Sequence, residues 1–503
     1  MCIRDRDILQ PSTLDVTIEM EQNHVNILII GAGLSGIGAA YHIEKESPQK
    51  TYRILESRDQ LGGTWDLFRY PGIRSDSDMT TMGFRFKPWK GEKLVAEGGA
   101  ILEYLNEIAD ENSINEKIQY HSHVHSVSWS SDESRWTVTY KNKRDDTDEI
   151  ITCDFLYFCV GYYDYDKAYQ PSFKGRENFK GQIVHPQKWP DDLDYEGKRV
   201  VVIGSGATAV TLIPSMAEKT EHITMLQRSP TYYVVRPNIN PLGNFIRRIT
   251  NNTIAYYVMR WQNINMQSFF FKRARRYPKR VKDFLIGLVK DHLPEDYDIE
   301  KHFTPPYNPW DQRLCLVPDG DLFNSIKDGN ASVVTDHIDE FTQKGIKLKS
   351  GDELEADIIV TATGFNVLLF GNIDITVDNK KIDPSKSMTY KGMMVSNVPN
   401  LIMTFGYTYA SWTLRADLTA EYACRLFNYM DKNGYKYCQP TPNGEIEIDG
   451  EWLDFNSGYV LRVLDKLPLQ GARDPWRNTQ NYKKDVLQLR YGRITDKELK
   501  FIS

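Results

Sequence analysis

The chain is predicted to be an α/β protein that contains two Rossmann-like dinucleotide-binding domains and a helical insertion. Two glycine-rich loops carry this prediction: Gly31–Gly36 reads GAGLSG, and Gly204–Ala209 reads GSGATA. Each loop follows a short segment rich in apolar residues, Val25–Ile30 or Lys198–Ile203, which is typical of a buried parallel strand that leads into a helix. A length of 503 residues is enough for two or three domains.

The composition argues against several other classes of protein. A formal net charge of -6 is not that of a general nucleic-acid binder. The cysteines are scattered and form no C-x-x-C pair, so we expect reduced thiols in a cytoplasmic protein and no metal site. No apolar run reaches about 18 residues, so no transmembrane helix is predicted. Residues 1–24 are polar and charged and are expected to form a flexible tail.

The first loop is predicted to bind a dinucleotide. Its glycines permit a tight turn, and the helix that begins near Leu34 presents free N–H groups and a positive dipole end to a pyrophosphate. The next strand, Tyr52–Leu55, ends in Glu56, where an acid that binds a ribose hydroxyl is expected. The candidate contacts in the loop are Gly31, Gly33, Ser35 and Gly36.

The second loop is predicted to prefer NADPH. Alanine replaces its last glycine, a variant common in NADP sites. The strand that follows, Ile223–Leu226, leads into Gln227, Arg228 and Ser229 rather than an acid. An acid there would repel a 2′-phosphate, whereas a guanidinium and a hydroxyl can bind it. The candidate contacts are Gly204, Ser205, Gly206, Ala207, Thr208, Ala209, Val210, Arg228 and Ser229.

Two longer motifs resemble those of a known family. Phe179–Pro190 reads FKGQIVHPQKWP, and Gly62–Asp76 reads GGTWDLFRYPGIRSD. Together with the two loops, these motifs are similar to the fingerprint of type I Baeyer–Villiger monooxygenases, a class of flavin-containing monooxygenase that uses FAD, NADPH and O2. The resemblance covers nearly the whole chain after Val25. It looks closest to the ethionamide-activating, FAD-containing type.

The resemblance implies roles for particular residues. Arg313 would be the active-site arginine beside the flavin, and Asp76 would hold it; a helix N-cap is the alternative role for Asp76. His185 would be a structural and coupling residue in the domain linker, with a satisfied buried histidine as the alternative. The remaining cofactor contacts would be Thr64, Trp65, Asp66, Leu67, Arg74, Ser75 and Val124, and the linker residues would be Phe179, Gly181, His185 and Trp189.

One position departs from the family pattern. The family usually has a lysine directly before the active-site arginine, where it reaches the 2′-phosphate, but this chain has Gln312. The loss of one charged hydrogen bond costs about 1.5–3 kcal/mol. We therefore expect the preference for NADPH over NADH to be weaker by about ten- to a hundred-fold, although Arg228 should still favour NADPH.

The expected domains follow from the order of the motifs. Residues 25–165 and 371–503 would form the FAD domain, with the second part also shaping the substrate cavity, and 166–370 would form the NADPH domain. The segment at about 240–300 is predicted to be its helical insertion, aromatic and basic from Lys272 through Lys282. We expect a solvated surface packed by one apolar stripe. Peripheral contact with an anionic membrane surface is the alternative.

The reaction that the resemblance implies is insertion of one oxygen atom of O2 beside a ketone carbonyl, through a C4a-peroxyflavin, to give an ester or lactone. The ethionamide-activating type also implies oxidation of sulfides and thioamides. The partner would be a small ketone or sulfide. The first alternative is an N- or S-oxygenating flavin monooxygenase, whose linker usually has tyrosine or phenylalanine where Trp189 stands. The second is a flavin-bound sensor without turnover.

Overall fold

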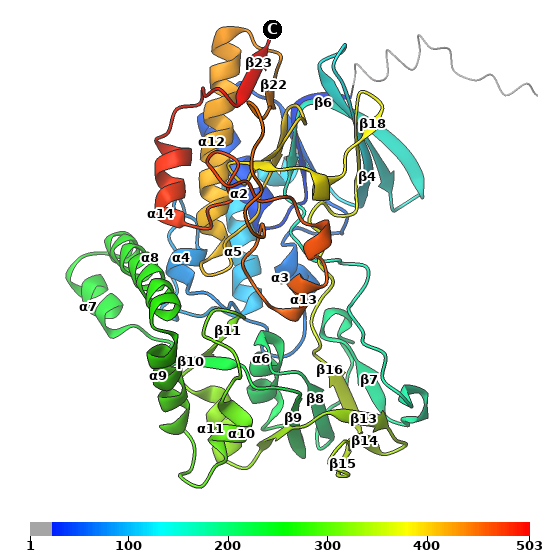
Figure 1. Cartoon of the computed structure of the whole chain (residues 1–503), viewed down its shortest axis with the longest axis vertical. Helices are drawn as coiled ribbons and strands as arrows, with labels where there is room; N and C mark the ends of the chain where they lie inside the picture. The colour runs from blue at the N-terminus through cyan, green and yellow to red at the C-terminus, as the bar shows by residue number, and fades with distance from the viewer. Residues whose placement is uncertain (1–22) are drawn as a thin grey trace, which may run out of the picture.

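A computed structural model describes residues 23–503 and shows two bodies, one above the other in Figure 1, each built on its own sheet. The predicted tail lies outside the described residues, apart from its last two. The helical insertion projects to the left in Figure 1, and the carboxyl terminus lies at the top beside β22 and β23.

The upper sheet has a parallel core. β1 (His24–Ile30) lies between β2 (Tyr52–Leu55) and β6 (Thr147–Phe158) and pairs with both in parallel. Because both faces of β1 are covered, its apolar run is buried nearly throughout. Strand order in the sheet is β18-β17-β4-β5-β6-β1-β2-β3, and β21 also pairs with β6. The other bounds are β3 (Ile118–Gln119), β4 (Ser122–Ser130), β5 (Arg135–Asn142), β17 (Asp374–Val377), β18 (Lys380–Lys381) and β21 (Leu401–Met403).

Helices from both ends of the chain cover this sheet. α2 (Leu34–Glu46) directly follows the first glycine-rich loop, and it packs against α12 (Trp412–Asn433). Their apolar side chains share one core cluster with residues of β1, including Ile27 and Ile29. The upper body is therefore closed only when the carboxyl-terminal part of the chain returns to it. The other helices here are α3 (Thr64–Leu67), α4 (Met79–Met82), α5 (Gly98–Glu111), α13 (Gly458–Leu461) and α14 (Tyr482–Asp485).

The lower sheet is parallel throughout, in the order β12-β9-β8-β16-β7. β8 (Arg199–Ile203) feeds α6 (Ala207–Met216) through the second glycine-rich loop, as β1 feeds α2. β10 and β11 form a separate pair of parallel strands. Arg313 directly precedes β11. The bounds are β7 (Gln182–Val184), β9 (His222–Gln227), β10 (Tyr232–Arg236), β11 (Leu314–Pro318), β12 (Ala331–Thr335), β16 (Ile358–Thr361), α10 (Ile299–Phe303) and α11 (Asp321–Lys327).

Two Rossmann-like units in one mixed α/β chain confirm the predicted fold class. The domain boundaries given above stay a prediction. Smaller strands complete the bodies: β13 (Ile338–Phe341), β14 (Gly345–Leu348), β15 (Glu353–Glu355), β19 (Thr389–Tyr390), β20 (Met394–Val395), β22 (Tyr437–Pro440) and β23 (Leu499–Ile502).

The insertion is helical and carries many apolar side chains on its surface. It consists of α7 (Pro241–Ile249), α8 (Asn252–Arg276) and α9 (Pro278–Lys290). Most of the exposed large apolar side chains within residues 23–503 lie between Ile239 and Phe284. The solvent-facing surface of the insertion therefore includes many apolar side chains. None of the helices in that range is long and apolar enough to cross a bilayer.

Candidate active site

The two glycine-rich loops contribute to one cavity of about 710 Å³. Gly31, Gly33 and Ser35 line it from the first loop, and Ala207 and Thr208 line it from the second. Ligands of open parallel sheets bind outside the carboxyl ends of the strands, which is where both loops lie. The cavity is therefore placed to bring two nucleotide-derived groups together.

The first loop fits a dinucleotide pyrophosphate. Gly31 has a φ of +99°, and a Cβ there would lie 2.7 Å from the carbonyl oxygen of Cys159. A Cβ on Gly36 would lie 1.9 Å from the Gly31 carbonyl oxygen, so only glycine lets α2 approach the loop. No side chain caps the amino terminus of α2 at Gly33, which leaves its N–H groups available to an anion.

Glu56 lies in the cavity wall at the end of β2, where an acid for the ribose was predicted. Its carboxylate accepts hydrogen bonds from the backbone N–H groups of Ala32 (2.7 Å) and Arg58 (2.9 Å). Burial raises the pKa of Glu56, and the N–H donors offset only part of that rise. The residues of this loop thus fit the adenosine end of FAD.

The second loop follows the same plan with one difference. Gly204 has a φ of +132°, and a Cβ there would lie 2.3 Å from the Ala362 carbonyl oxygen. Ala209 occupies the third position, where its methyl group is fully buried. α6 again begins without a side-chain cap, at Gly206. The Ser205 hydroxyl donates to the carbonyl oxygen of Ser229, 3.3 Å away.

Several predicted NADPH contacts lie beyond the cavity wall. Arg228 is exposed just after β9, on the segment that continues the second nucleotide-binding unit. An exposed guanidinium at this point can reach a 2′-phosphate that projects from the cavity. The residues of this group outside the lining are Gly204, Ser205, Gly206, Ala209, Val210, Arg228 and Ser229.

The Gly62–Asp76 motif contains a short helix, α3. Thr64 and Trp65 line the cavity. Asp66 does not line the cavity, because its carboxylate is fully buried and forms ion pairs with Arg58 and Arg69. Arg58 Nε lies 2.6 Å from Asp66 Oδ2. The Asp66 side chain therefore anchors α3, and Leu67 packs against the core of the lower body.

Arg313 and Asp76 meet at this cavity, as the family resemblance implied. Arg313 Nη2 lies 2.5 Å from Asp76 Oδ2, and Arg313 Nη1 donates to the Thr408 carbonyl oxygen at 2.8 Å. Asp76 lines the cavity, whereas Arg313 lies behind it. The burial of Arg313 works against its charge, but Asp76 together with Tyr459 and Tyr162 outweighs this effect, so the guanidinium pKa is raised. The cation is therefore permanent and held in place.

The residues next to Asp76 have separate structural partners, and one of them joins the two bodies. Arg74 lines the cavity and forms an ion pair with Asp321 at the start of α11 in the lower body. The Ser75 hydroxyl accepts a hydrogen bond from the backbone N–H of Ala96, 3.2 Å away. The N-cap of α4 is Asp78, not Asp76: the Asp78 carboxylate accepts from the backbone N–H of Thr81. Asp76 is thus left available to Arg313.

Helix α8 of the insertion reaches the same segment. Asn263 Nδ2 and Gln267 Nε2 donate to the two carboxylate oxygens of Asp78, at 3.0 and 2.9 Å. Asn263 also donates to the Thr80 hydroxyl. Because Asp78 lies two residues after Asp76, the insertion supports the part of the chain that holds Arg313.

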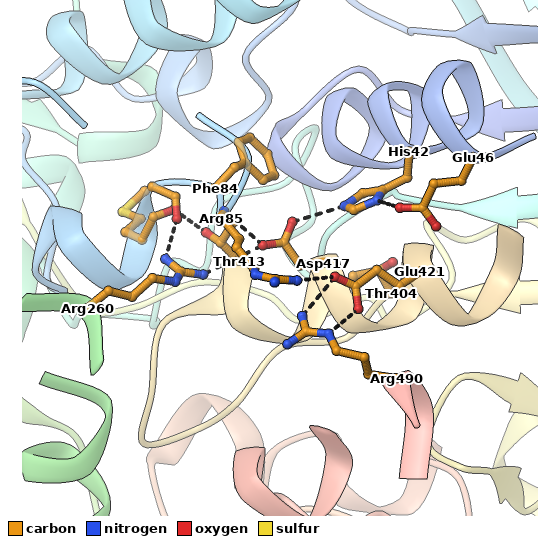
Figure 2. Close-up of polar contacts among 12 residues, drawn as sticks. His42, Glu46, Phe84, Arg85, Arg260, Thr404, Thr413, Asp417, Glu421 and Arg490 are labelled. Carbon is orange, nitrogen blue, oxygen red and sulfur yellow. Dashed lines mark hydrogen bonds and ion pairs between the residues drawn. The ribbon is translucent and has the colours of Figure 1, made fainter. Parts of the chain in front are cut away.

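Figure 2 shows the buried charge cluster that fixes α8 to the upper body. Arg260, only 5% exposed, donates to the carbonyl oxygens of Thr80 (2.9 Å) and Gly83 (2.7 Å), and lies 3.6 Å from Asp417 of α12. Asp417 also contacts His42 of α2. This cluster could not be predicted from sequence spacing, because its members come from three distant segments.

His42 is the group in this cluster whose pKa moves from below neutral pH to above it. Burial lowers its pKa, but the hydrogen bonds to Asp417 and Glu46 outweigh burial and raise the pKa to about 9. His42 Nδ1 lies 2.7 Å from Glu46 Oε1, and Nε2 lies 3.4 Å from Asp417 Oδ1. The histidine is therefore cationic at neutral pH.

The domain linker lies behind the cavity wall. His185 is buried, its Nδ1 accepts from the Gln187 backbone N–H (3.1 Å), and its ring faces Phe365, which lines the cavity. Burial lowers the His185 pKa. A Cβ on Gly181 would lie 2.2 Å from the carbonyl oxygen of Asp357, the residue directly before β16. The linker therefore packs tightly against the start of that strand. The other linker residues predicted, Phe179 and Trp189, pack on two different cores of the lower body.

Several wall residues were missed in the sequence. Tyr162, Tyr163 and Tyr165 line the cavity just after β6. Tyr162 stacks on Trp412, with ring centroids 5.1 Å apart, and Trp412 Nε1 donates to the Ser35 hydroxyl at 2.8 Å. Their position in the chain could have indicated this role, because these tyrosines follow β6, a strand that pairs in parallel with β1. Val124, predicted as a cofactor contact, lines the cavity together with His123, His125 and Lys143.

The fold and cavity define a flavoprotein with two dinucleotide sites, and the comparisons identify its class. Residues 94–432 match the flavin-binding monooxygenase-like family, and residues 29–89 match the NAD(P)-binding Rossmann-like domain. The chain belongs to the flavin-binding monooxygenase-like family. This confirms the predicted family, with FAD and NADPH as its cofactors and O2 as its co-substrate.

Relatives of known name cover nearly the whole chain. The FAD-containing monooxygenase EthA of Mycobacterium tuberculosis is 51% identical over 95% of this chain and 98% of its own length. The probable FAD-binding monooxygenase AlmA of Acinetobacter baylyi is 46% identical over 95% and 96%. Among solved structures, an oxidized steroid monooxygenase bound to NADP has a TM-score of 0.77 at 21% identity, covering 95% of this chain and all of that one. An open structure of cyclohexanone monooxygenase has a TM-score of 0.74 at 22% identity, over 96% and 100%. At these identities the solved structures show the fold alone.

Proposed function

We propose that this flavin monooxygenase is of the Baeyer–Villiger type and inserts one oxygen atom of O2 between a ketone carbonyl and its neighbouring carbon. The observation that carries the proposal is the Arg313 guanidinium, held by Asp76 where that residue lines the cavity. Ketone oxygenation builds up negative charge on the former carbonyl oxygen. A permanent, positioned cation stabilises such charge without reorganising during the reaction.

The other residues divide the work of binding. FAD, when bound and reduced by NADPH, supplies the activation of O2. The amino terminus of α2 binds the FAD pyrophosphate, and Glu56 binds the ribose. The amino terminus of α6 and Arg228 bind NADPH through its phosphates. Tyr162 and Trp412, stacked in the wall, exclude water from the reacting centre.

Oxidation of sulfides is the second activity that we propose for the same cavity. Transfer of oxygen to sulfur leaves no charged carbonyl oxygen to stabilise, so it depends less on Arg313. The two activities can therefore be separated by one variant at that residue. The resemblance to the ethionamide-activating type favours including thioamides in the substrate set.

The test is NADPH consumption by the purified yellow protein with phenylacetone, 2-octanone or a thioether, followed by mass-spectrometric identification of the products. We expect ester from the ketones. Sulfoxide without any ester would contradict the Baeyer–Villiger assignment and favour an N- or S-oxygenating enzyme. Absence of NADPH consumption with every substrate would favour the sensor.

A further inference from the structure

The insertion carries a concentration of exposed apolar side chains that nothing in the described chain covers. In α7, Leu242, Phe245 and Ile249 are spaced three and four residues apart, and Ile249 is 64% exposed. This spacing puts the three side chains on one face of the helix. Scattered exposed apolar residues are ordinary, whereas a concentrated patch marks an interaction site.

Helix α8 extends this surface. Ile254, Val258, Trp261 and Phe269 fall on one helical face by their spacing, and Trp261 is 69% exposed. We call the exposed side chains of both helices the insertion patch; it consists of Leu242, Phe245, Ile249, Ile254, Val258, Trp261 and Phe269. α7 packs against α8, and Figure 1 shows both helices projecting from the body.

A cluster of cations adjoins the patch. Lys272 and Arg276 continue the exposed face of α8 towards its carboxyl end, eleven and fifteen residues after Trp261. The exposed members of the cluster are Arg248, Lys272, Arg273, Arg276, Lys279 and Arg280. None of them takes part in an ion pair within residues 23–503. No aspartate or glutamate occurs between Pro241 and Lys282, although the whole chain carries a net charge of -6.

We propose that the insertion patch and its cations dock the protein onto an anionic lipid bilayer. Aromatic and aliphatic side chains beside uncompensated lysines and arginines are the composition of helices that lie in the membrane interface. A symmetric contact between two copies would bring the same cations to one interface. The charge pattern therefore favours lipid phosphate over a second copy as the occupant.

The opposite face of α8 gives this docking a consequence for the cavity. Arg260 and Asn263 on that face are buried against the upper body. Phe271 stacks on Tyr409, with ring centroids 4.5 Å apart, next to the carbonyl of Thr408 that binds Arg313. A docked protein would thus hold Arg313 one helix away from the lipid. This inference does not rest on the reaction type proposed above.

The test is flotation of the FAD-loaded protein with vesicles of phosphatidylcholine, with and without phosphatidylglycerol, at low and high salt. We expect flotation with the anionic vesicles that weakens at high salt. Each Lys or Arg near such a surface contributes roughly fivefold in affinity. A variant carrying Lys272→Ser, Arg273→Ser and Arg276→Ser should therefore bind about a hundred-fold more weakly.

A second variant removes the apolar contacts, through Phe245→Ser and Trp261→Ser, and should lose the binding that persists at high salt. The matched control is Leu487→Ser with Tyr491→Ser, because these side chains are 66% and 71% exposed but lie outside the insertion. The control should float like the unchanged protein. Flavin content and oxidation of NADPH with a water-soluble ketone, which do not need a membrane, should be the same in all variants.

Three results would overturn the proposal. The unchanged protein could stay with the dense fraction at low salt. The control variant could lose binding as fully as the insertion variants. Analytical ultracentrifugation could show a dimer that the insertion variants abolish, without flotation of the unchanged protein, in which case the patch is an interface between copies.

Discussion

Replacement of Arg313 by alanine tests the centre of the proposed mechanism. A guanidinium about 4 Å from the developing negative charge contributes about 4 kcal/mol at an effective dielectric constant near 20. The Asp76 carboxylate pairs with the same guanidinium at 2.5 Å and opposes it. Because Asp76 itself lines the cavity, its opposing charge makes the figure of about 4 kcal/mol an upper value, and a carboxylate about 7 Å from the developing charge would already cancel about 2.4 kcal/mol.

The net stabilisation then lies between about 2 and 4 kcal/mol, which corresponds to roughly a twentyfold to thousandfold loss of ester formation in Arg313→Ala. Flavin reduction by NADPH under anaerobic conditions should stay close to the unchanged rate. In air, NADPH consumption should continue and yield hydrogen peroxide in place of ester. Oxidation of a thioether should fall much less than ester formation.

The measurement compares single-turnover ester yield with the rate of anaerobic flavin reduction. Arg135→Ala is a matched control, because the Arg135 side chain is 29% exposed and paired with a glutamate, while Arg313 is 28% exposed and paired with Asp76. Arg135 lies on β5, away from the cavity wall. Ester formation by Arg313→Ala at the rate of the control would refute the role of this cation.

Three further predictions concern the cofactors and the charge cluster. Gly36→Ala should lower the free energy of unfolding by about 1–3 kcal/mol through overpacking against the Gly31 carbonyl, and it should lower the flavin content. In Gly206→Ala the added methyl group meets nothing within 4 Å, so this variant should keep its flavin. Equal flavin absorbance in both proteins would contradict this prediction. Arg228→Ala should raise KM for NADPH by about ten- to a hundred-fold, the equivalent of about 1.5–3 kcal/mol, and leave KM for NADH nearly unchanged in steady-state assays. His42, with a pKa of about 9 against an ordinary 6.5, should contribute up to about 3 kcal/mol of stability that is present below pH 6.5 and lost as the pH rises through 9. Urea unfolding of the unchanged protein and His42→Gln should therefore differ most at pH 6 and least at pH 10, and a pH-independent difference would disprove the assignment.

Much of the fold could be predicted because local chemistry decides it. The buried runs that form β1 and β8 end in glycine loops whose backbone conformation excludes most side chains, as at Gly31 and Gly204. Gly36 and Ala209 show that even the difference between the loops has a local steric cause. Arg313 and Asp76, 237 residues apart, were paired only through the family resemblance, because spacing alone does not relate such distant positions.

The amino-acid sequence by itself determined the two nucleotide-binding units, since each strand, turn and helix start is encoded within a few neighbouring residues. Only the tertiary structure decided which face of α8 is buried. Its residues repeat at helical spacing on several sides, and the burial of Arg260 depends on carbonyl groups and an aspartate that distant segments bring to it. The packing of α8 against the upper body leaves Trp261 and Phe269 exposed, because only one face of a helix can pack against a given partner.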